Sequence, residues 1–345
     1  MTKVAVVLVA ALLGSTLAFS PFELAAQQGN GSSTGSIVLL NEPCVAYDSV
    51  GNDGPLEGGE SRPIQITGSL PGSQGGSDDC GVPPTATSAV LSVAATNSLG
   101  LGNLRVSEGD VPPNGGVVNY AANGLDNTNT VVVPLSASGH IDLSANAGPS
   151  GSGSPTTDSR LIVVGYHDPT APATQVVPVT PCAVSDSRVT QGATGDYAGP
   201  FSSTDQPPLI TVTGDIPAEQ GGNNSDCGIP TDATGVLANI VAIGASGTGH
   251  LAAGSAISDP QLPTTAFAPI GMNNAAVAWI PLDTNGQIDV NPITTDGTVH
   301  TRTVVVGYIT SGNSDSTGFT AVTPCAAFDS RPNVCLLYTS PSPRD

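Results

Sequence analysis

The residues of this chain that could carry chemistry recur in a short motif, Pro-Cys-x-x-x-Asp-Ser, which occurs three times. The copies lie at 43–49, 181–187 and 324–330, so their starts are about 140 residues apart, the size of one ordinary domain. A thiol and a carboxylate at this spacing could form a disulfide, bind a cation or open a ligand-binding loop. A fixed period of this length predicts two complete domain-sized units and the beginning of a third.

Each complete unit contains two cysteines, and we expect them to form one disulfide per unit. Cys44 and Cys80 are 36 residues apart, and Cys182 and Cys227 are 45 apart. Closing loops of these lengths stabilises a fold by about 4 kcal/mol each in the chain-entropy model. Zinc binding is the alternative, but no CxxC pair or Cys/His cluster supports it. Cys325 then lacks a partner because the third unit is cut off.

The acidic residue of the motif has two interpretations. Asp48, Asp186 and Asp329 each lie four residues after a cysteine. One interpretation is a turn, in which Asp and Ser bond the local backbone and an arginine pairs with the acid. The other is a ligand-binding loop with Asp48, Asp186 and Arg188 as contacts, which is weakened because the first copy has Val50 in place of that arginine. Ca²⁺ is the only cofactor that such loop acids leave open, and no EF-hand-like spacing accompanies them.

Comparison of the two units tests for catalytic residues, because a group that each unit needs should recur. The histidines do not recur: His140 corresponds to Gln287, and His250 to Asn103. No HExxH is present, and no GxSxG elbow follows a strand and opens a helix. No glutamate recurs that could form a glycosidase pair. We therefore predict no catalytic residues and a protein that is not an enzyme.

Aromatic side chains bear on carbohydrate binding, which usually requires exposed rings on a β-sandwich. Trp279 is the only tryptophan, and it corresponds to Val132. Tyr166 and Tyr308 do recur, near the end of each unit. These two tyrosines are candidate ligand contacts, and the alternative is a core or corner position with the hydroxyl bonded.

The elements that must position these residues are predicted to be short strands. The chain has 42 glycines and 30 prolines, which disfavour long helices. Short runs of Val, Ala and Ile are bounded by turn residues, as in all-β proteins. We therefore expect an all-β fold of two tandem β-sandwich or jelly-roll-like domains. Prolines inside the runs at 131–135 and 278–282 predict edge strands or bulges there.

The predicted organisation of the chain combines these domains with segments outside the fold. It comprises a signal peptide at 1–26, a flexible spacer at 27–36, a first β domain at 37–166, a linker at 167–175, a second β domain at 176–310, a spacer at 311–319, the start of a truncated third repeat at 320–334 and a foreign tail at 335–345.

The two ends are predicted to lie outside the fold. Lys3 and the apolar run that follows it resemble a secretory signal, with cleavage after Ala18 or Ala26, and that run is too short to span a bilayer. Residues 335–345 read CLLYTSPSPRD, which resembles a translated sequencing adapter, and we exclude them from fold reasoning.

The charge balance limits the partners. With 28 acidic and 8 basic residues, the formal net charge is −20. Such a surface repels nucleic acid and anionic membranes. We expect a secreted or cell-surface protein that spans no membrane and binds no nucleic acid. Its expected partners are cell-envelope or extracellular polysaccharide, or other surface proteins.

The order of motifs resembles the repeat units of secreted bacterial surface proteins, which pair a "DTR" opening with an "IP..A.AV..N.T" strand and a closing "VDV.GY". The matching segments here are 186–188 (DSR), 229–230 (IP) and 307–308 (GY). Ser replaces Thr in the opening, and Val replaces the acid before Gly-Tyr. The resemblance covers most of 37–331 and implies an exported all-β surface module without catalytic residues. The expected function is therefore a structural or adhesive repeat, and the alternative is a carbohydrate-binding module attached to an enzyme domain that is missing here.

Overall fold

The computed structural model describes residues 36–111, 116–121, 126–147, 155–172, 174–222, 225–255, 263–269 and 273–311. The predicted signal peptide, the third motif copy with Cys325 and Asp329, and the adapter-like tail lie outside the described residues. Within them, strands dominate and the helices are single 3-10 turns, so the all-β prediction is confirmed. None of these helices is long and apolar enough to cross a membrane.

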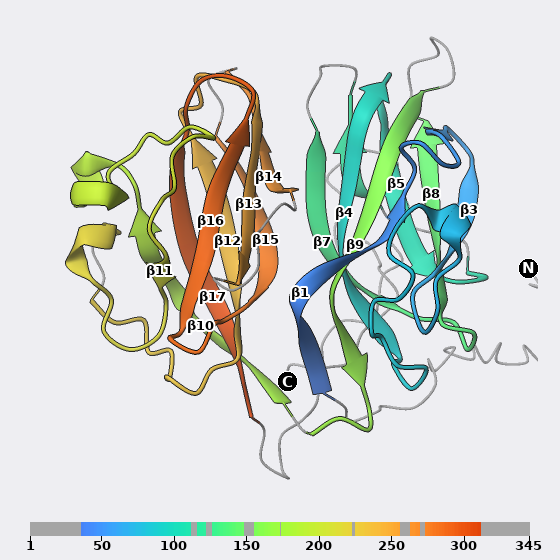
Figure 1. Cartoon of the computed structure of the whole chain (residues 1–345), viewed down its shortest axis with the longest axis horizontal. Coiled ribbons are helices and arrows are strands. Elements are labelled where there is room, and N and C mark those ends of the chain that lie inside the picture. The colour runs from blue at the N-terminus through green and yellow to red at the C-terminus, as the bar shows by residue number, and fades with distance from the viewer. Residues whose placement is uncertain are drawn as a thin grey trace, which may run out of the picture. The chain divides into compact units, whose positions relative to one another are not determined.

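The first sandwich consists of two antiparallel sheets (Figure 1). One has the order β1-β9-β4-β7, with β2 also paired to β9, and the other has the order β3-β8-β5-β6. The bounds are β1 Ser36–Asp48, β2 Leu56–Glu57, β3 Ser61–Gln65, β4 Ser88–Leu99, β5 Gly102–Glu108, β6 Gly116–Tyr120, β7 Asn127–Pro134, β8 His140–Ala147 and β9 Thr156–Asp168, with the 3-10 turn η1 at Gly72–Gln74.

The second sandwich has the same strand order. Its sheets are β10-β17-β12-β15 and β11-β16-β13-β14, so each strand has a counterpart in the first sandwich at the same place. The bounds are β10 Thr174–Asp186, β11 Ile210–Thr211, β12 Gly235–Ile243, β13 Gly249–Ser255, β14 Pro263–Phe267, β15 Asn274–Pro281, β16 Gln287–Thr294 and β17 His300–Ser311, with 3-10 turns η2 Val189–Gln191, η3 Gly195–Tyr197 and η4 Ala218–Gln220.

Each sandwich encloses its own core. Leu91 and Leu161 of one sheet and Leu104 and Ile141 of the other are fully buried in the first core, because alternate residues of a strand face the same side. Val236, Ile240, Leu251 and Ile288 fill the second core in the same way. Burying a side chain of this size stabilises a fold by about 1.5–3 kcal/mol, so the paired sheets supply the rigid frame for the loops.

The prolines predicted to lie at edges do so. Pro134 is the last residue of β7 and Pro281 the last of β15, and each of these strands is the outer strand of its sheet. A proline has no N–H to donate to a neighbouring strand, so an edge position leaves the sheet's hydrogen bonds intact.

Strand β4 is buried on both faces along most of its length. One face looks into the first core, and Val90 on the other face belongs to a separate buried cluster with Ile162 and Val164. Ile309 of the second sandwich belongs to the same cluster, and the partly buried Trp279 packs against it. The mostly apolar run at 89–95, interrupted only by Ser92, therefore reflects a strand covered on both sides.

The two predicted disulfides are present. Cys44 is bonded to Cys80 and Cys182 to Cys227, with Cα atoms 5.5 and 5.8 Å apart. In each sandwich the bridge joins the first long strand, β1 or β10, to the loop that precedes β4 or β12. That loop has almost no regular structure of its own, so the bridge fixes a segment that the sheets do not hold.

Removal of one bridge should destabilise its sandwich strongly. The C44A/C80A variant is expected to lose about 4 kcal/mol of unfolding free energy, because the unfolded chain regains the freedom of a 36-residue loop. Urea unfolding without reductant measures this loss, and the C182A/C227A variant is the matched comparison for the second sandwich. Unfolding curves for both variants that coincide with the wild-type curve would contradict the assignment.

Candidate functional site

The motif Pro-Cys-x-x-x-Asp-Ser lies at the end of the opening strand, which is β1 in the first sandwich and β10 in the second. The opening strand pairs with the closing strand, β9 or β17, and the pairing is interrupted by a register shift on each side of the cysteine. Bulges of this kind break the backbone ladder locally. Side chains must therefore hold the end of the opening strand in place.

The aspartate of the motif binds an arginine of the closing strand. Asp48 is opposite Arg160 in the strand register, and Arg160 Nε donates to Asp48 Oδ2 at 2.8 Å. Asp186 is likewise opposite Arg302, whose Nε lies 3.5 Å from Asp186 Oδ2. Sequence reasoning missed both arginines, although each lies six residues before the closing tyrosine, Tyr166 or Tyr308.

The second sandwich adds a further arginine to this contact. Arg188 donates from Nε to Asp186 Oδ1 at 2.9 Å and from Nη2 to Oδ2 at 2.6 Å, the two-point geometry that makes such pairs strong. Asp186 is 1% exposed. The local bond that the turn interpretation predicted for the aspartate is present, since the N–H groups of Val50 and Arg188 donate to Asp48 and Asp186 two residues earlier. The motif serine, which that interpretation also bonded to the local backbone, bonds the closing strand instead.

The serine of the motif bonds the backbone of the closing strand. The N–H of Ser159 donates to Ser49 Oγ at 3.0 Å, and the N–H of Thr301 donates to Ser187 Oγ at 2.9 Å. Both serines are buried. The Ser49 hydroxyl donates to Asp158 at 2.9 Å, whereas the Ser187 hydroxyl lies 3.1 Å from His300 Nδ1. Ser187 and His300 thus form a partly buried contact.

A buried glutamine joins the opening strand to the opposite sheet. Gln74 Nε2 donates to the carbonyl of Ala46 in β1 at 2.8 Å, and its Oε1 accepts from the N–H of Gln65 in β3 at 2.7 Å. The second sandwich repeats this bridge, because Gln220 donates to Val184 at 2.9 Å and accepts from Thr211 at 2.8 Å. Sequence reasoning missed both, although each lies in the recurring tripeptide Gln-Gly-Gly.

The glycines of this tripeptide allow the loop to approach the opening strand closely. A Cβ on Gly75 would lie 2.5 Å from the carbonyl oxygen of Asp48, and one on Gly221 would lie 2.4 Å from that of Asp186. Both glycines have positive φ, which other residues rarely adopt. We call the set of disulfide, Asp, Ser and Gln the opening-strand clamp: Cys44–Cys80, Asp48, Ser49 and Gln74 in the first sandwich, and Cys182–Cys227, Asp186, Ser187 and Gln220 in the second.

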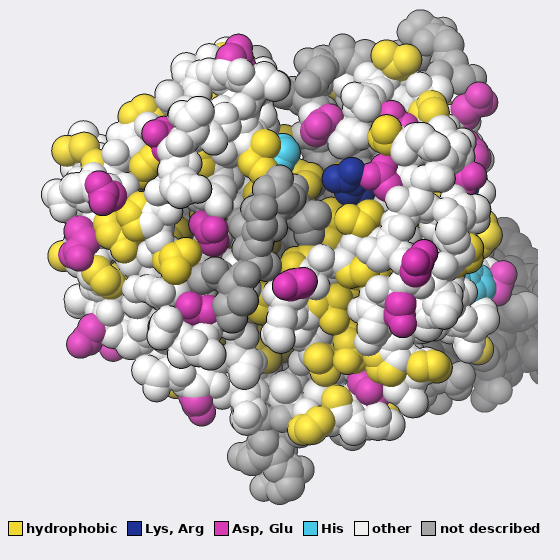
Figure 2. All heavy atoms as spheres, viewed as in Figure 1, with side chains coloured by type: hydrophobic (Ala, Val, Ile, Leu, Met, Phe, Trp, Pro, Cys, Tyr) yellow, Lys and Arg dark blue, Asp and Glu magenta, His cyan; other side chains and the backbone are white. Residues whose placement is uncertain are grey.

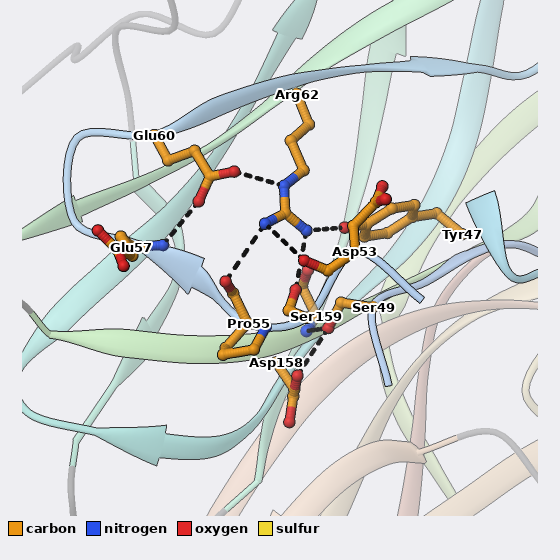
Figure 3. Close-up of polar contacts among 10 residues, drawn as sticks. Tyr47, Ser49, Asp53, Pro55, Glu57, Glu60, Arg62, Asp158 and Ser159 are labelled. Carbon is orange, nitrogen blue, oxygen red and sulfur yellow. Dashed lines mark hydrogen bonds and ion pairs between the residues drawn. The ribbon is translucent and has the colours of Figure 1, made fainter. Parts of the chain in front are cut away.

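Next to the first clamp lies a polar hollow of about 410 Å³, lined by Asp53, Glu60, Arg62, Pro63, Ile64, Pro71, Ser73 and Gln74. Figure 3 shows the Arg62 guanidinium surrounded by acceptors. Its Nε bonds Glu60 at 2.7 Å, its Nη1 bonds Tyr47 Oη at 2.6 Å and the Gly54 carbonyl at 2.8 Å, and its Nη2 reaches the carbonyls of Asp53 and Pro55. Arg62 thus fastens the loop at 53–55 to the core.

The charges around Arg62 follow from these bonds. Burial raises the pKa of the Tyr47 phenol despite its bond to Arg62, so Tyr47 stays neutral. Burial opposes ionisation of Glu60, but the bonds from Arg62 and from the Glu57 N–H outweigh it and lower the pKa of Glu60. The exposed rim of the hollow is acidic through Asp53, which suits a polyhydroxyl or cationic ligand better than an anion.

The tyrosines considered as sugar contacts are only partly exposed. Tyr166 packs against the first core and Tyr308 against the second. Burial raises the pKa of Tyr166, as expected for a ring that lies largely against apolar neighbours. In the part of the chain that the structure covers, no three His, Cys, Asp or Glu side chains gather in a way that could hold a metal ion.

Comparisons with known proteins give little further information. No protein-family model matches the chain, and no curated protein matches it. Among solved structures, the PBSX exported protein XepA matches with 13% identity and a TM-score of 0.21, over 80% of this chain and 88% of that one. The tandem CBM22-1–CBM22-2 domains of Paenibacillus barcinonensis Xyn10C match with 10% identity and a TM-score of 0.18, over 79% and 99%. At these TM-scores neither likeness bears on function.

Replacing the clamp aspartate with asparagine should lower the unfolding free energy more in the second sandwich than in the first. Asp186→Asn leaves Arg188 and Arg302 without their carboxylate, and we expect a loss of about 2–3 kcal/mol of unfolding free energy. Asp48→Asn leaves only Arg160 without its carboxylate, so we expect a smaller loss of unfolding free energy. Urea unfolding measures both, with Asp78→Asn on the exposed loop as the control. A loss for Asp186→Asn no larger than the control value would contradict the role of the clamp.

The second sandwich should also lose stability in mild acid, because His300 contacts Ser187 of the clamp. Burial lowers the pKa of His300 below 6.5, and Arg188 adds to this effect, while Ser187 and Asp186 oppose it. The unfolded chain therefore binds a proton before the folded chain does, and stability falls as pH drops from about 6.5 towards the folded pKa. Unfolding free energies at pH 7 and pH 5 should differ more for the wild type than for His300→Gln. Equal pH slopes for the two proteins would rule out this contribution.

Proposed function

We propose that this protein is a non-catalytic structural module of the cell surface or extracellular medium, built from tandem disulfide-closed β units. The observation that carries the proposal is the repetition of the clamp: at corresponding positions of both sandwiches, the recurring Cys, Ser and Gln side chains make the same intramolecular bonds. The recurring Asp contacts the closing-strand arginine in both, through a hydrogen bond in the first sandwich and an ion contact of 3.5 Å in the second. Residues kept for a shared reaction would instead point their polar atoms towards a common substrate space.

The disulfides and the acidic surface agree with an extracellular setting. Disulfides persist in oxidising compartments, which supports an extracellular location. The face seen in Figure 2 carries acidic side chains scattered over both sandwiches, with little basic surface. A strongly acidic surface keeps a protein soluble and apart from anionic polymers. Neutral polysaccharides and other surface proteins are therefore the partners that we propose.

The proposal predicts a protein that resists proteolysis and turns over no substrate. Subtilisin is a suitable protease because it does not require Lys or Arg, which are scarce here, at its cleavage site. Oxidised protein should resist it, whereas protein treated with dithiothreitol should be cut within the loops at 49–55 and 66–87. Gel analysis with and without reductant measures this difference. Panels of polysaccharide, ester and peptide substrates should show no hydrolysis. Turnover that is lost in a Ser187→Ala variant with unchanged stability would overturn the proposal.

Carbohydrate binding is the second candidate, and the hollow beside Arg62 favours it. The hollow offers two carboxylates, a hydroxyl and two prolines within one concave surface, a combination that can receive sugar hydroxyls and C–H faces. A glycan array with the wild type and with Asp53→Ala and Ser73→Ala variants tests this candidate. Binding that these substitutions abolish would support the hollow, whereas binding lost only in Tyr166→Ala or Tyr308→Ala would assign it to the tyrosines.

A further inference from the structure

The two sandwiches differ in how far one sheet face is covered. In the first, the middle parts of β4 and β9 are buried at consecutive positions, and therefore on both faces. In the second, the corresponding strands β12 and β17 alternate between buried and partly exposed residues. Such alternation belongs to a sheet with one face on a core and the other face open. The outer face of the β10-β17-β12-β15 sheet is therefore open where the outer face of its counterpart is covered.

The residues at equivalent positions of these two faces are apolar in both sandwiches. Counting along the corresponding strands gives the pairs Val90 and Leu237, Ala94 and Val241, Ile162 and Val304, and Val164 and Val306. The first member of each pair is at most 8% exposed, whereas the second member is partly exposed. In the first sandwich, Val90, Ile162 and Val164 form a buried cluster with Ile309 of the second. One β unit thus already uses this face to receive another β unit of the same kind.

The outward residues of the second sandwich lie side by side. Val304 of β17 is opposite Asn239 of β12, which is opposite Val277 of β15, and Val277 is 40% exposed. Leu237 lies two residues before Asn239, on the same face of β12. It is opposite Trp279, which packs against the cluster between the sandwiches, so the two apolar surfaces are continuous. We call the outward residues the open face: Leu237, Asn239, Val241, Val277, Val304 and Val306.

The strands that carry the open face contain almost no acidic residues. The chain has 28 Asp and Glu residues, but β12, β15 and β17 contain none of them. The one acidic residue of β10, Asp186, is 1% exposed and is bonded by Arg188. Charged residues are depleted at the centres of protein interfaces. A patch without carboxylates is also the place where two copies of a strongly acidic protein repel each other least.

We propose that the open face is a docking surface for a second copy of this chain, which places its own open face against it. Valine and leucine side chains on two such faces suit the face-to-face packing of antiparallel sheets, and exposed apolar patches of this kind mark interaction sites. A two-fold contact uses the same residues on both copies and closes at the dimer. The contact joins two of the structural modules proposed above, so its biological use rests on the proposed function, whereas its existence does not.

Sedimentation velocity of the full chain over a concentration series tests the proposal. We expect a monomer–dimer equilibrium that strengthens with added NaCl, because salt screens the repulsion between chains of net charge −20. Val277→Asp and Val304→Asp each place a carboxylate in the contact and should raise the dimer Kd by about tenfold or more. Leu101→Asp is the matched control, because Leu101 is 53% exposed on the first sandwich and the change in charge is the same. Its Kd should equal that of the wild type.

Three results would overturn the proposal. They are a chain that stays monomeric at every concentration and salt level, a dimer that Val277→Asp and Val304→Asp weaken no more than the control does, and oligomers that keep growing beyond the dimer. Val277→Asp keeps the test valid if Val304→Asp fails to fold, since the side chain of Val277 is the more exposed of the two. A monomeric chain that still turns over no substrate would overturn the dimer and leave the structural role intact.

Discussion

The fold of each sandwich depends on the contact between its opening and closing strands. Asp48 and Arg160 are 112 residues apart in the chain, so this contact closes almost the whole unit. Closing so long a loop has a high entropic cost, and the two register shifts remove part of the backbone ladder that would offset it. The clamp compensates by fixing the end of the opening strand in three directions: to the closing strand through Asp and Ser, to the opposite sheet through Gln, and to the long loop through the disulfide.

The two sandwiches keep this clamp while changing what surrounds it. The first adds Arg62, which joins Tyr47, Glu60 and the loop at 53–55 into one network. The second has no such arginine but engages Arg188 with Asp186 directly. Since the clamp is common and the neighbouring networks are not, the clamp meets a structural need of the fold, and the hollow beside Arg62 is a property of the first sandwich.

The sequence predicted the parts of the structure that local pattern determines. Apolar runs bounded by turn residues marked most core strands, the prolines at 134 and 281 marked edges, and the cysteine spacing gave both disulfides. Strands β2, β6, β13 and β14 were not predicted, because their sequences are very short or show no clear alternation of apolar and polar residues.

The side chains of the clamp were harder to predict because their partners are distant in sequence. An ion pair between Asp48 and Arg160 has no local signature, so the sequence analysis considered only the nearby Arg188 as a partner for the motif acid. Gln74 and Gln220 were missed for another reason: a glutamine in a glycine-rich loop is usually solvated, and only the recurrence of Gln-Gly-Gly indicated otherwise. Comparing the two units for all recurring residues, and not only for catalytic types, would have found these glutamines and arginines.

The central claim is that the motif acid acts through the closing-strand arginine, and a double-mutant cycle between Asp48 and Arg160 tests it most directly. Unfolding free energies of the wild type, Asp48→Asn, Arg160→Gln and the double variant give the coupling between the two side chains. We predict that the losses of unfolding free energy in the two single variants add up to about 0.5–3 kcal/mol more than the loss in the double variant, as for residues in direct contact. Strictly additive losses would contradict the account.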